Sequence, residues 1–346
     1  PILAYIGVCI FSSALGSLRG TTNPYHSIFY LLKYFEYFLV FFMVTNNIRN
    51  KRQVKSFVVA MLAVSVVVNT YALATFSQYA GRATAPFEGR MGEANTLAGY
   101  LLVIMGMGIG LLLYSKSIKK IILFAGFLLY ALATFFHTQS RGGLLGLIVM
   151  GLAFLFLTRR NKIILLFMFL VGLLVFPFIA PRGIIERYQG AFQKGPQYQE
   201  TLEFFGKKIE LDDSATERVR SLRESLRLWS EYPILGRGVP GGVWVSDVQY
   251  TRVVQEVGVI GFLIFIWMIV VLFRVGWRSF RDDNLDDFGK GLSLGFISSF
   301  AGLMAMGISS EVFIVIRIME PFWFLAAMVT TLPELYGEGL EIKEQI

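Results

Sequence analysis

Long apolar stretches separated by short polar breaks recur along this chain. Crossing the hydrocarbon core of a bilayer as a helix takes about 20 mostly apolar residues, and a transmembrane β-barrel would instead show short alternating segments. The pattern therefore predicts an all-α fold, a polytopic transmembrane helical bundle of about ten spans. The expected spans are 1–17, 25–45, 54–76, 96–114, 120–137, 142–158, 162–180, 252–274, 289–308 and 312–333.

Composition supports a bilayer as the solvent. The 346 residues are 55% hydrophobic and only 16% charged, which is more apolar than a soluble domain can bury. The formal net charge of +8 is explained by basic cytoplasmic loops, so we expect no nucleic-acid partner. A single cysteine, Cys9, and two histidines argue against a disulfide framework or a metal site, and we expect no cofactor.

The distribution of lysine and arginine among the loops predicts the orientation, because cytoplasmic loops carry the excess of both. Basic residues cluster in alternate connections, around positions 49–55, 116–120, 159–162 and 278–281. These connections are assigned to the cytoplasm, which places the segment 181–251 outside. The protein is then a multi-pass membrane protein, and we expect any chemistry that it performs to lie on the outer face of the membrane.

The outer segment 181–251 is too long for a simple connector. Its second half predicts an amphipathic helix that opens with the capping box Ser214-Ala-Thr-Glu217 and has an apolar stripe of Val219, Leu222, Leu226 and Trp229. We predict one integral membrane domain over 1–346, with this loop inside it. Because residues 1–10 are already apolar and no initiator Met precedes them, we expect earlier spans before this chain.

Three arginines, Arg82, Arg90 and Arg141, are expected at the outer membrane boundary, although arginine and lysine prefer cytoplasmic loops. Arginine suits bidentate recognition of phosphate, and an anionic headgroup at the interface is a natural partner. The alternative is that they pair with nearby glutamates or reach lipid phosphates. They are candidate anion-binding residues.

Two acidic residues, Asp247 and Glu256, follow near the start of the next span. Nine residues separate them, which is two and a half helical turns, so they cannot form a close carboxylate pair on one face. Glu256 lies inside an apolar run, where an ionisable residue is a functional candidate; the alternative is an ion pair with Arg252, four residues earlier. Asp247 is either a helix N-cap or a general base.

Five short motifs, in this order and spacing, resemble the O-antigen ligase and polymerase superfamily of bacterial envelope enzymes. The resemblance covers about residues 80–265. The matching stretches are Arg90-Met-Gly-Glu-Ala-Asn95, Ser140-Arg-Gly-Gly143, Glu217-Arg-Val-Arg followed by Trp229, Pro233-Ile-Leu-Gly-Arg-Gly238, and Glu256-Val-Gly-Val-Ile-Gly261.

The resemblance implies a metal-independent membrane glycosyltransferase that takes a glycan from undecaprenyl diphosphate and passes it to a glycan acceptor. Arg90 and Arg141 would hold the diphosphate, and Arg82 and Arg237 would assist them, because arginines can stabilise a leaving diphosphate. Tyr250 is a further candidate for binding the substrate. Asp247 and Glu256 are the catalytic candidates. Membrane lipid, a chain-length regulator or a flippase are further possible partners.

One position departs from the ligase pattern. Ligases of this group resemble one another in a His-Asn pair nine residues before the Glu of the Glu-x-Gly segment, whereas this chain has Asp247-Val248 there. A carboxylate can serve as a base, so we favour a polymerase of O-antigen, capsule or exopolysaccharide repeat units. The alternatives are an O-antigen ligase acting on lipid A core or another acceptor and, from another class, a transporter of lipid-linked glycan.

Overall fold

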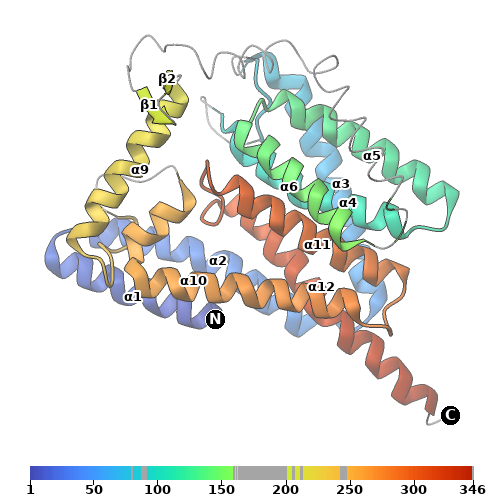
Figure 1. The fold of residues 1–346 in the computed structure, drawn as a ribbon. Helices are drawn as coiled ribbons and strands as arrows, with labels where there is room; N and C mark the ends of the chain where they lie inside the picture. The colour runs from blue at the N-terminus through green and yellow to red at the C-terminus, as the bar shows by residue number, and fades with distance from the viewer. Residues whose placement is uncertain are drawn as a thin grey trace. The chain divides into compact units, whose positions relative to one another are not determined.

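The computed structural model describes residues 1–78, 81–86, 92–158, 160, 162, 201–204, 207–210, 213–241 and 248–344. Helices make up most of this part of the chain (Figure 1). They are α1 (Ile2–Arg19), α2 (Pro24–Asn47), α3 (Lys51–Thr75), the 3-10 turn η1 (Phe76–Gln78), α4 (Ala94–Tyr114), α5 (Ile118–His137), α6 (Arg141–Leu157), α9 (Asp213–Glu231), α10 (Gln249–Arg281), α11 (Asp287–Met306) and α12 (Ile316–Glu344). The all-α, polytopic fold predicted from the sequence is confirmed.

Seven helices in the described part of the chain are long and apolar enough to cross a bilayer. They are α1, α2, α3 with η1, α4, α5, α10 and α11. Helix α6 is also apolar but has only 17 residues. The predicted span at 162–180 lies, apart from its first residue, outside the described residues, and α12 includes Arg317, Glu320 and two prolines among its apolar residues.

The chain packs as two compact units whose segments alternate along the sequence. Unit 1 consists of Pro1–Phe35, Phe176–Met268 and Gly307–Glu311; unit 2 consists of Glu36–Val175, Ile269–Met306 and Val312–Ile346. Because neither unit is a continuous stretch of sequence, no single cut separates them. The single domain expected over 1–346 stays a prediction.

Unit 2 is held together by close helix packing at glycines. Helices α4, α6 and α11 lie side by side (Figure 1). A Cβ added to Gly110 would lie 2.1 Å from the carbonyl oxygen of Gly291, and one added to Gly295 would lie 2.6 Å from that of Gly106. Each helix thus carries a Gly-x-x-x-Gly pair, which lets the two backbones touch as in many membrane bundles.

The basic loops of unit 2 that were assigned to one side of the membrane do come together. Lys116, after α4, and Arg160, after α6, both pair with Asp287 at the start of α11, at 2.7 and 2.8 Å. Lys55 near the start of α3 lies over the ring of Phe288. This clustering agrees with the up-and-down order of spans on which the predicted orientation rests.

The long loop contains a β-hairpin that the sequence reasoning did not foresee. Strands β1 (Thr201–Phe204) and β2 (Lys207–Glu210) pair antiparallel, with Thr201 opposite Glu210. The two strands are short and are joined by only two residues. The sequence therefore contains no long run of alternating apolar and polar residues from which they could be predicted.

Helix α9 forms where the sequence predicts it, and its buried positions lie outside the expected apolar stripe. Leu222 and Leu226 of the expected apolar stripe are exposed, whereas Ser221, Ser225 and Leu228 are buried. Serine leaves little bulk on a helix face and can bond back to its own turn, as Ser225 does to the carbonyl of Ser221 at 2.7 Å. The buried face is therefore the narrow hydroxyl face, and the leucines remain available to lipid.

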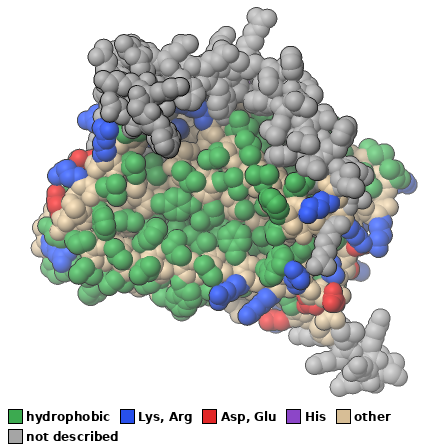
Figure 2. All heavy atoms as spheres, in the orientation of Figure 1, with side chains coloured by type: hydrophobic (Ala, Val, Ile, Leu, Met, Phe, Trp, Pro, Cys, Tyr) green, Lys and Arg blue, Asp and Glu red, His purple; other side chains and the backbone are tan. Residues whose placement is uncertain are grey.

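Hydrophobic side chains cover much of the face shown in Figure 2, and Lys and Arg side chains lie mostly toward its margins. Large apolar residues on the spans are exposed, among them Leu3, Val67, Leu129 and Phe156. A surface of this kind is suited to hydrocarbon rather than water.

Candidate functional site

Helix α10 is interrupted near its start, in unit 1. Gly258 has φ 64° and ψ −168° inside the helix, a conformation that residues with a side chain rarely adopt. The break lies within the Glu256–Gly261 motif. It frees backbone groups that a continuous helix would pair internally, so these groups need other partners.

The loop between α9 and α10 supplies those partners. Arg237 N and Gly238 N donate to the carbonyls of Gln255 and Glu256, each at 2.9 Å. In return, Val259 N donates to the carbonyl of Pro233 at 2.9 Å, and Ile260 N to that of Ile234 at 3.2 Å. Two motifs quoted separately from the sequence, 233–238 and 256–261, therefore form one backbone-paired element.

Glycines are needed where this element is tightest. A Cβ at Gly236 would lie 2.5 Å from the carbonyl carbon of Glu256, and one at Gly258 would lie 2.3 Å from the carbonyl oxygen of Ile234. Both residues also have positive φ. The glycines at these motif positions thus permit contact between two backbones.

Hydroxyl groups from the first two helices hold the loop from its other side. Ser12 Oγ donates to the carbonyls of Leu235 at 2.5 Å and Glu256 at 2.7 Å. Ser13 Oγ accepts from Val239 N at 3.1 Å, and Ser27 Oγ donates to the carbonyl of Val239 at 2.5 Å. Sequence reasoning missed these serines; a Ser-Ser pair inside an apolar span was the available signal.

Glu256 lies in a buried ion-pair network. Arg252 Nε donates to Glu256 Oε1 at 2.7 Å, and the two side chains are 3% and 1% exposed. Arg252 also pairs with Glu311, and Tyr34 Oη donates to Glu256 Oε2 at 3.5 Å. The ion pair with Arg252, one of the two interpretations of Glu256, is therefore present. With both carboxylate oxygens engaged, Glu256 is placed to stabilise this region.

Arg237 lies on the outer side of the same loop. Its guanidinium pairs with Glu231 and lies 5.6 Å from the centre of the Tyr232 ring, on which Arg19 also packs at 5.0 Å. Glu231 also binds Arg227, and hydrogen bonds from Arg227 hold the pKa of Glu224 below its ordinary value. Tyr250, in the first turn of α10, is half-buried.

Unit 2 brings the Arg82 segment onto the turn that precedes α6. Arg82 Nε donates to the carbonyl of Thr138 at 3.1 Å, and Ala83 N donates to that of His137 at 2.7 Å. Gln139, whose φ is 52°, donates from its amide to the carbonyl of Gly81 at 3.1 Å. Arg141 begins α6 directly after this turn, so Arg82 and Arg141 belong to one local structure.

Ser140 connects this turn to the start of α4. Its Oγ accepts from Gly143 N at 3.0 Å, which caps α6, and donates to Asn95 Oδ1 at 2.7 Å. Asn95 ends the motif 90–95 and Ser140 begins the motif 140–143. These two motifs thus meet at the ends of neighbouring helices, with Arg141 as the first residue of α6.

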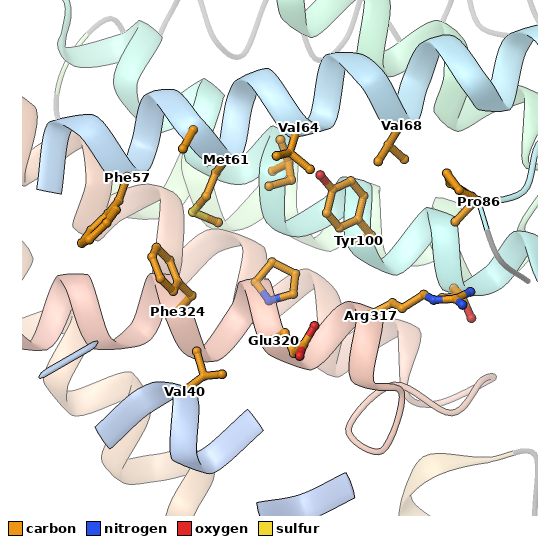
Figure 3. A pocket seen from close by; sticks show the side chains of 15 residues that line it. Val40, Phe57, Met61, Val64, Val68, Pro86, Tyr100, Arg317, Glu320 and Phe324 are labelled. Carbon is orange, nitrogen blue, oxygen red and sulfur yellow. The ribbon is translucent and has the colours of Figure 1, made fainter. Parts of the chain in front are cut away.

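An apolar pocket of about 490 Å³ opens among α2, α3, α4 and α12 in unit 2. Figure 3 shows Arg317 and Pro86 at one end and Phe57 and Phe324 at the other, with Glu320 and Tyr100 between them. We call it the Arg317 pocket. Ala85 and Thr96 also line it, so its polar end adjoins both the Arg82 segment and Asn95.

The structure brings the sequence-predicted residues into two groups. Arg82 and Arg141 share the turn before α6 in unit 2, whereas Arg237, Tyr250 and Glu256 belong to unit 1. Arg90 and Asp247 lie outside the described residues. Arg317 was not chosen from the sequence; an arginine at the start of a predominantly apolar helix was the signal for it.

Comparison with known families finds one match. Residues 126–266 match the sequence model of a family described as O-antigen ligase, and this stretch covers less than half of the chain. It contains the turn before α6, the long loop and the break in α10. No curated protein matches the chain.

Proposed function

We propose that this chain, whose residues 126–266 match the O-antigen ligase family, polymerises glycan repeat units carried on undecaprenyl diphosphate. The enzyme works from the outer face of the bacterial inner membrane. It joins units of an O-antigen, a capsule or an exopolysaccharide. Its donor has a long apolar tail, an anionic diphosphate and a sugar, and its site must accommodate all three.

The observation that carries this proposal is the Arg317 pocket. Its walls are almost entirely apolar, and one end carries Arg317 beside Ala85, Pro86 and Thr96. From Thr96 to Ile104 the pocket follows α4 for about 12 Å at a rise of 1.5 Å per residue. A polyprenyl chain fits such a wall, and a diphosphate at its head would then lie by the arginine-bearing end.

The diphosphate would be bound by arginines at the starts of α6 and α12 and in the segment before α4. Arg82 is three residues before Ala85, and Arg141 follows Ser140, which is bonded to Asn95 beside Thr96. Arg90 lies in the segment between Pro86 and α4. Guanidinium groups offer forked donors that fit phosphate oxygens and remain charged at any working pH.

In the reaction, the acceptor hydroxyl attacks the anomeric carbon of the donor sugar. The bond from that carbon to the diphosphate oxygen breaks, and its electron pair leaves with undecaprenyl diphosphate. The hydroxyl proton passes to a base, for which Asp247 is our candidate. The arginines stabilise the charge that develops on the leaving group.

The carboxylate at position 247 favours a polymerase over a ligase, because ligases that resemble this chain carry His-Asn at that place. A ligase that moves finished glycan to lipid A core remains the second candidate.

Substituting Asp247 distinguishes a general base from a helix N-cap. Asn is a good N-cap but no base, so we expect both Asp247→Asn and Asp247→Ala to abolish polymer formation.

The direct test in cells uses Arg141→Ala, in a strain whose only copy is the variant. We expect loss of polymer and accumulation of single lipid-linked repeats, with the protein still inserted. Arg278→Ala is the matched control, since Arg278 is an exposed arginine in the last turn of α10. Full-length polymer from Arg141→Ala would refute the diphosphate site. Accumulation of free lipid-linked polymer instead would identify a ligase.

A further inference from the structure

A second pocket, of about 1150 Å³, opens in unit 2 among α3, α4, α5 and the start of α11. Lys55, Lys116 and Lys120 stand at one end, and we call it the Lys120 pocket. Its walls are apolar side chains of α3 and α5, such as Leu62 and Phe127. Tyr130 lines its far end, and the hydroxyls of Tyr130 and Thr70 form a hydrogen bond of 2.8 Å.

The depth of the Lys120 pocket matches one leaflet of a bilayer. Along α5 it extends from Lys120 to Tyr130, which is about 15 Å at a rise of 1.5 Å per residue. The hydrocarbon core of a bilayer is about 30 Å thick, so each leaflet contributes about 15 Å. An acyl chain that enters at the lysines would therefore end near the Thr70–Tyr130 bond.

The charged end of the pocket is arranged for an anion. Asp287 is neutralised by Lys116 and Arg160, and Asp286 accepts from Gly289 N at 2.8 Å, as an N-cap of α11. Lys55 and Lys120 are both exposed at the pocket mouth. Two cations are thus left over after the two carboxylates have been satisfied, which favours a phosphate group.

We propose that the Lys120 pocket binds an anionic glycerophospholipid of the leaflet on the lysine side, with its phosphate at Lys55 and Lys120 and an acyl chain along α3 and α5. Basic pockets between transmembrane helices on the cytoplasmic side commonly bind such headgroups. This lipid is a resident of the protein and not the glycan donor. Its binding does not depend on the reaction proposed above.

The headgroup test uses native mass spectrometry of the delipidated full chain with dioleoyl phosphatidylglycerol and dioleoyl phosphatidylcholine. We expect the wild type to bind the anionic lipid about thirtyfold more tightly, which corresponds to roughly 1 kcal/mol for each of two lysines. Lys55→Gln with Lys120→Gln should remove this preference. Arg52→Gln with Lys119→Gln is the matched control, because it removes two exposed charges from the same helix starts outside the pocket.

A second variant tests the acyl wall without touching any charge. Gly126 lines the pocket, and a Cβ there would meet no atom within 4 Å. Gly126→Phe should therefore fill the pocket without strain and weaken phosphatidylglycerol binding about tenfold. Gly7→Phe is its control, since Gly7 of α1 also faces open space.

Three results would overturn the proposal: no preference for phosphatidylglycerol in the wild type, an unchanged preference in the double lysine variant, or unchanged binding in Gly126→Phe. If the lysine variant fails to fold, the Gly126→Phe result decides alone.

Discussion

The two units use glycine for opposite purposes. In unit 2, Gly110 and Gly291 let α4 and α11 touch while both helices stay continuous, so the contact requires no break in either helix. In unit 1, Gly258 interrupts α10, and the freed groups pair with the 233–238 loop. Irregular backbone at membrane depth is tolerated only where protein or a cavity satisfies it. The first arrangement packs two continuous helices together, and the second fastens a loop to an interrupted helix.

The two units also differ in where some of their charged side chains lie. In unit 1, Arg252 is enclosed between Glu256 and Glu311, with 3% of its side chain exposed. In unit 2, the cations gather at helix ends, as Lys116 and Arg160 do at Asp287. A buried, paired charge fixes geometry, whereas cations at a helix end can bind an anion. The anion sites proposed above both lie in unit 2.

The largest effect is expected from Gly258→Ala. A positive φ with an extended ψ costs a residue with a side chain about 1–3 kcal/mol, and the new Cβ would lie 2.3 Å from the carbonyl oxygen of Ile234, which adds a further overpacking cost. We expect a loss of about 4 kcal/mol in the free energy of unfolding, measured in detergent by denaturant titration. Gly7→Ala, in open space, should be neutral. Equal stability of both variants would contradict the described break.

A smaller effect is expected at Glu256. Glu256→Ala leaves Arg252 buried with Glu311 as its remaining carboxylate, and breaking a buried pair costs about 3 kcal/mol. Glu256→Gln keeps an acceptor for Arg252 and should lose less. The informative readout is activity at matched folded protein: a positioning residue retains part of it as Gln, whereas a catalytic carboxylate loses all of it. Complete inactivity of a well-folded Gln variant would favour the catalytic interpretation.

The smallest effect is expected at the scaffold contact. Gly110→Ala places a Cβ 2.1 Å from the carbonyl of Gly291, but both helices can move apart without losing backbone hydrogen bonds. We expect a loss of about 2 kcal/mol by the same titration. Gly126→Ala is the matched control, and it should be neutral or slightly stabilising because alanine favours helix. If Gly110→Ala lost more free energy of unfolding than Gly258→Ala, the proposed difference between the two units would be wrong.

Periodicity and hydropathy were sufficient to predict most spans, because each span is a local apolar run. They could not predict the break at Gly258, since its partners are Pro233 and Ile234, which are distant in sequence from the groups that they satisfy. For the same reason, the role of Ser12 could not be predicted, because its acceptors, Leu235 and Glu256, are distant in the sequence. The order of the motifs and the ionisable Glu256 in an apolar run were the signals that pointed to this region.

For the candidate site, a charged residue in an unexpected place was the criterion for choosing candidates. It identified Glu256, together with the alternative ion pair with Arg252 that the structure contains, and it selected Arg82 and Arg141, which share one turn. It could not identify the Arg317 pocket, because a pocket is made by helices α3, α4 and α12 together. The buried face of α9 could not be recognised because Ser221 and Ser225 on it form no apolar pattern.

The most direct measurement is a reaction of the purified chain in lipid vesicles with an undecaprenyl-diphosphate-linked oligosaccharide repeat, followed by gel analysis of the glycans. We predict a ladder of products that grows by whole repeats as undecaprenyl diphosphate is released, and no ladder with Arg141→Ala. A donor that stays intact with the wild type, or is only hydrolysed to free single repeats, would contradict the proposed function.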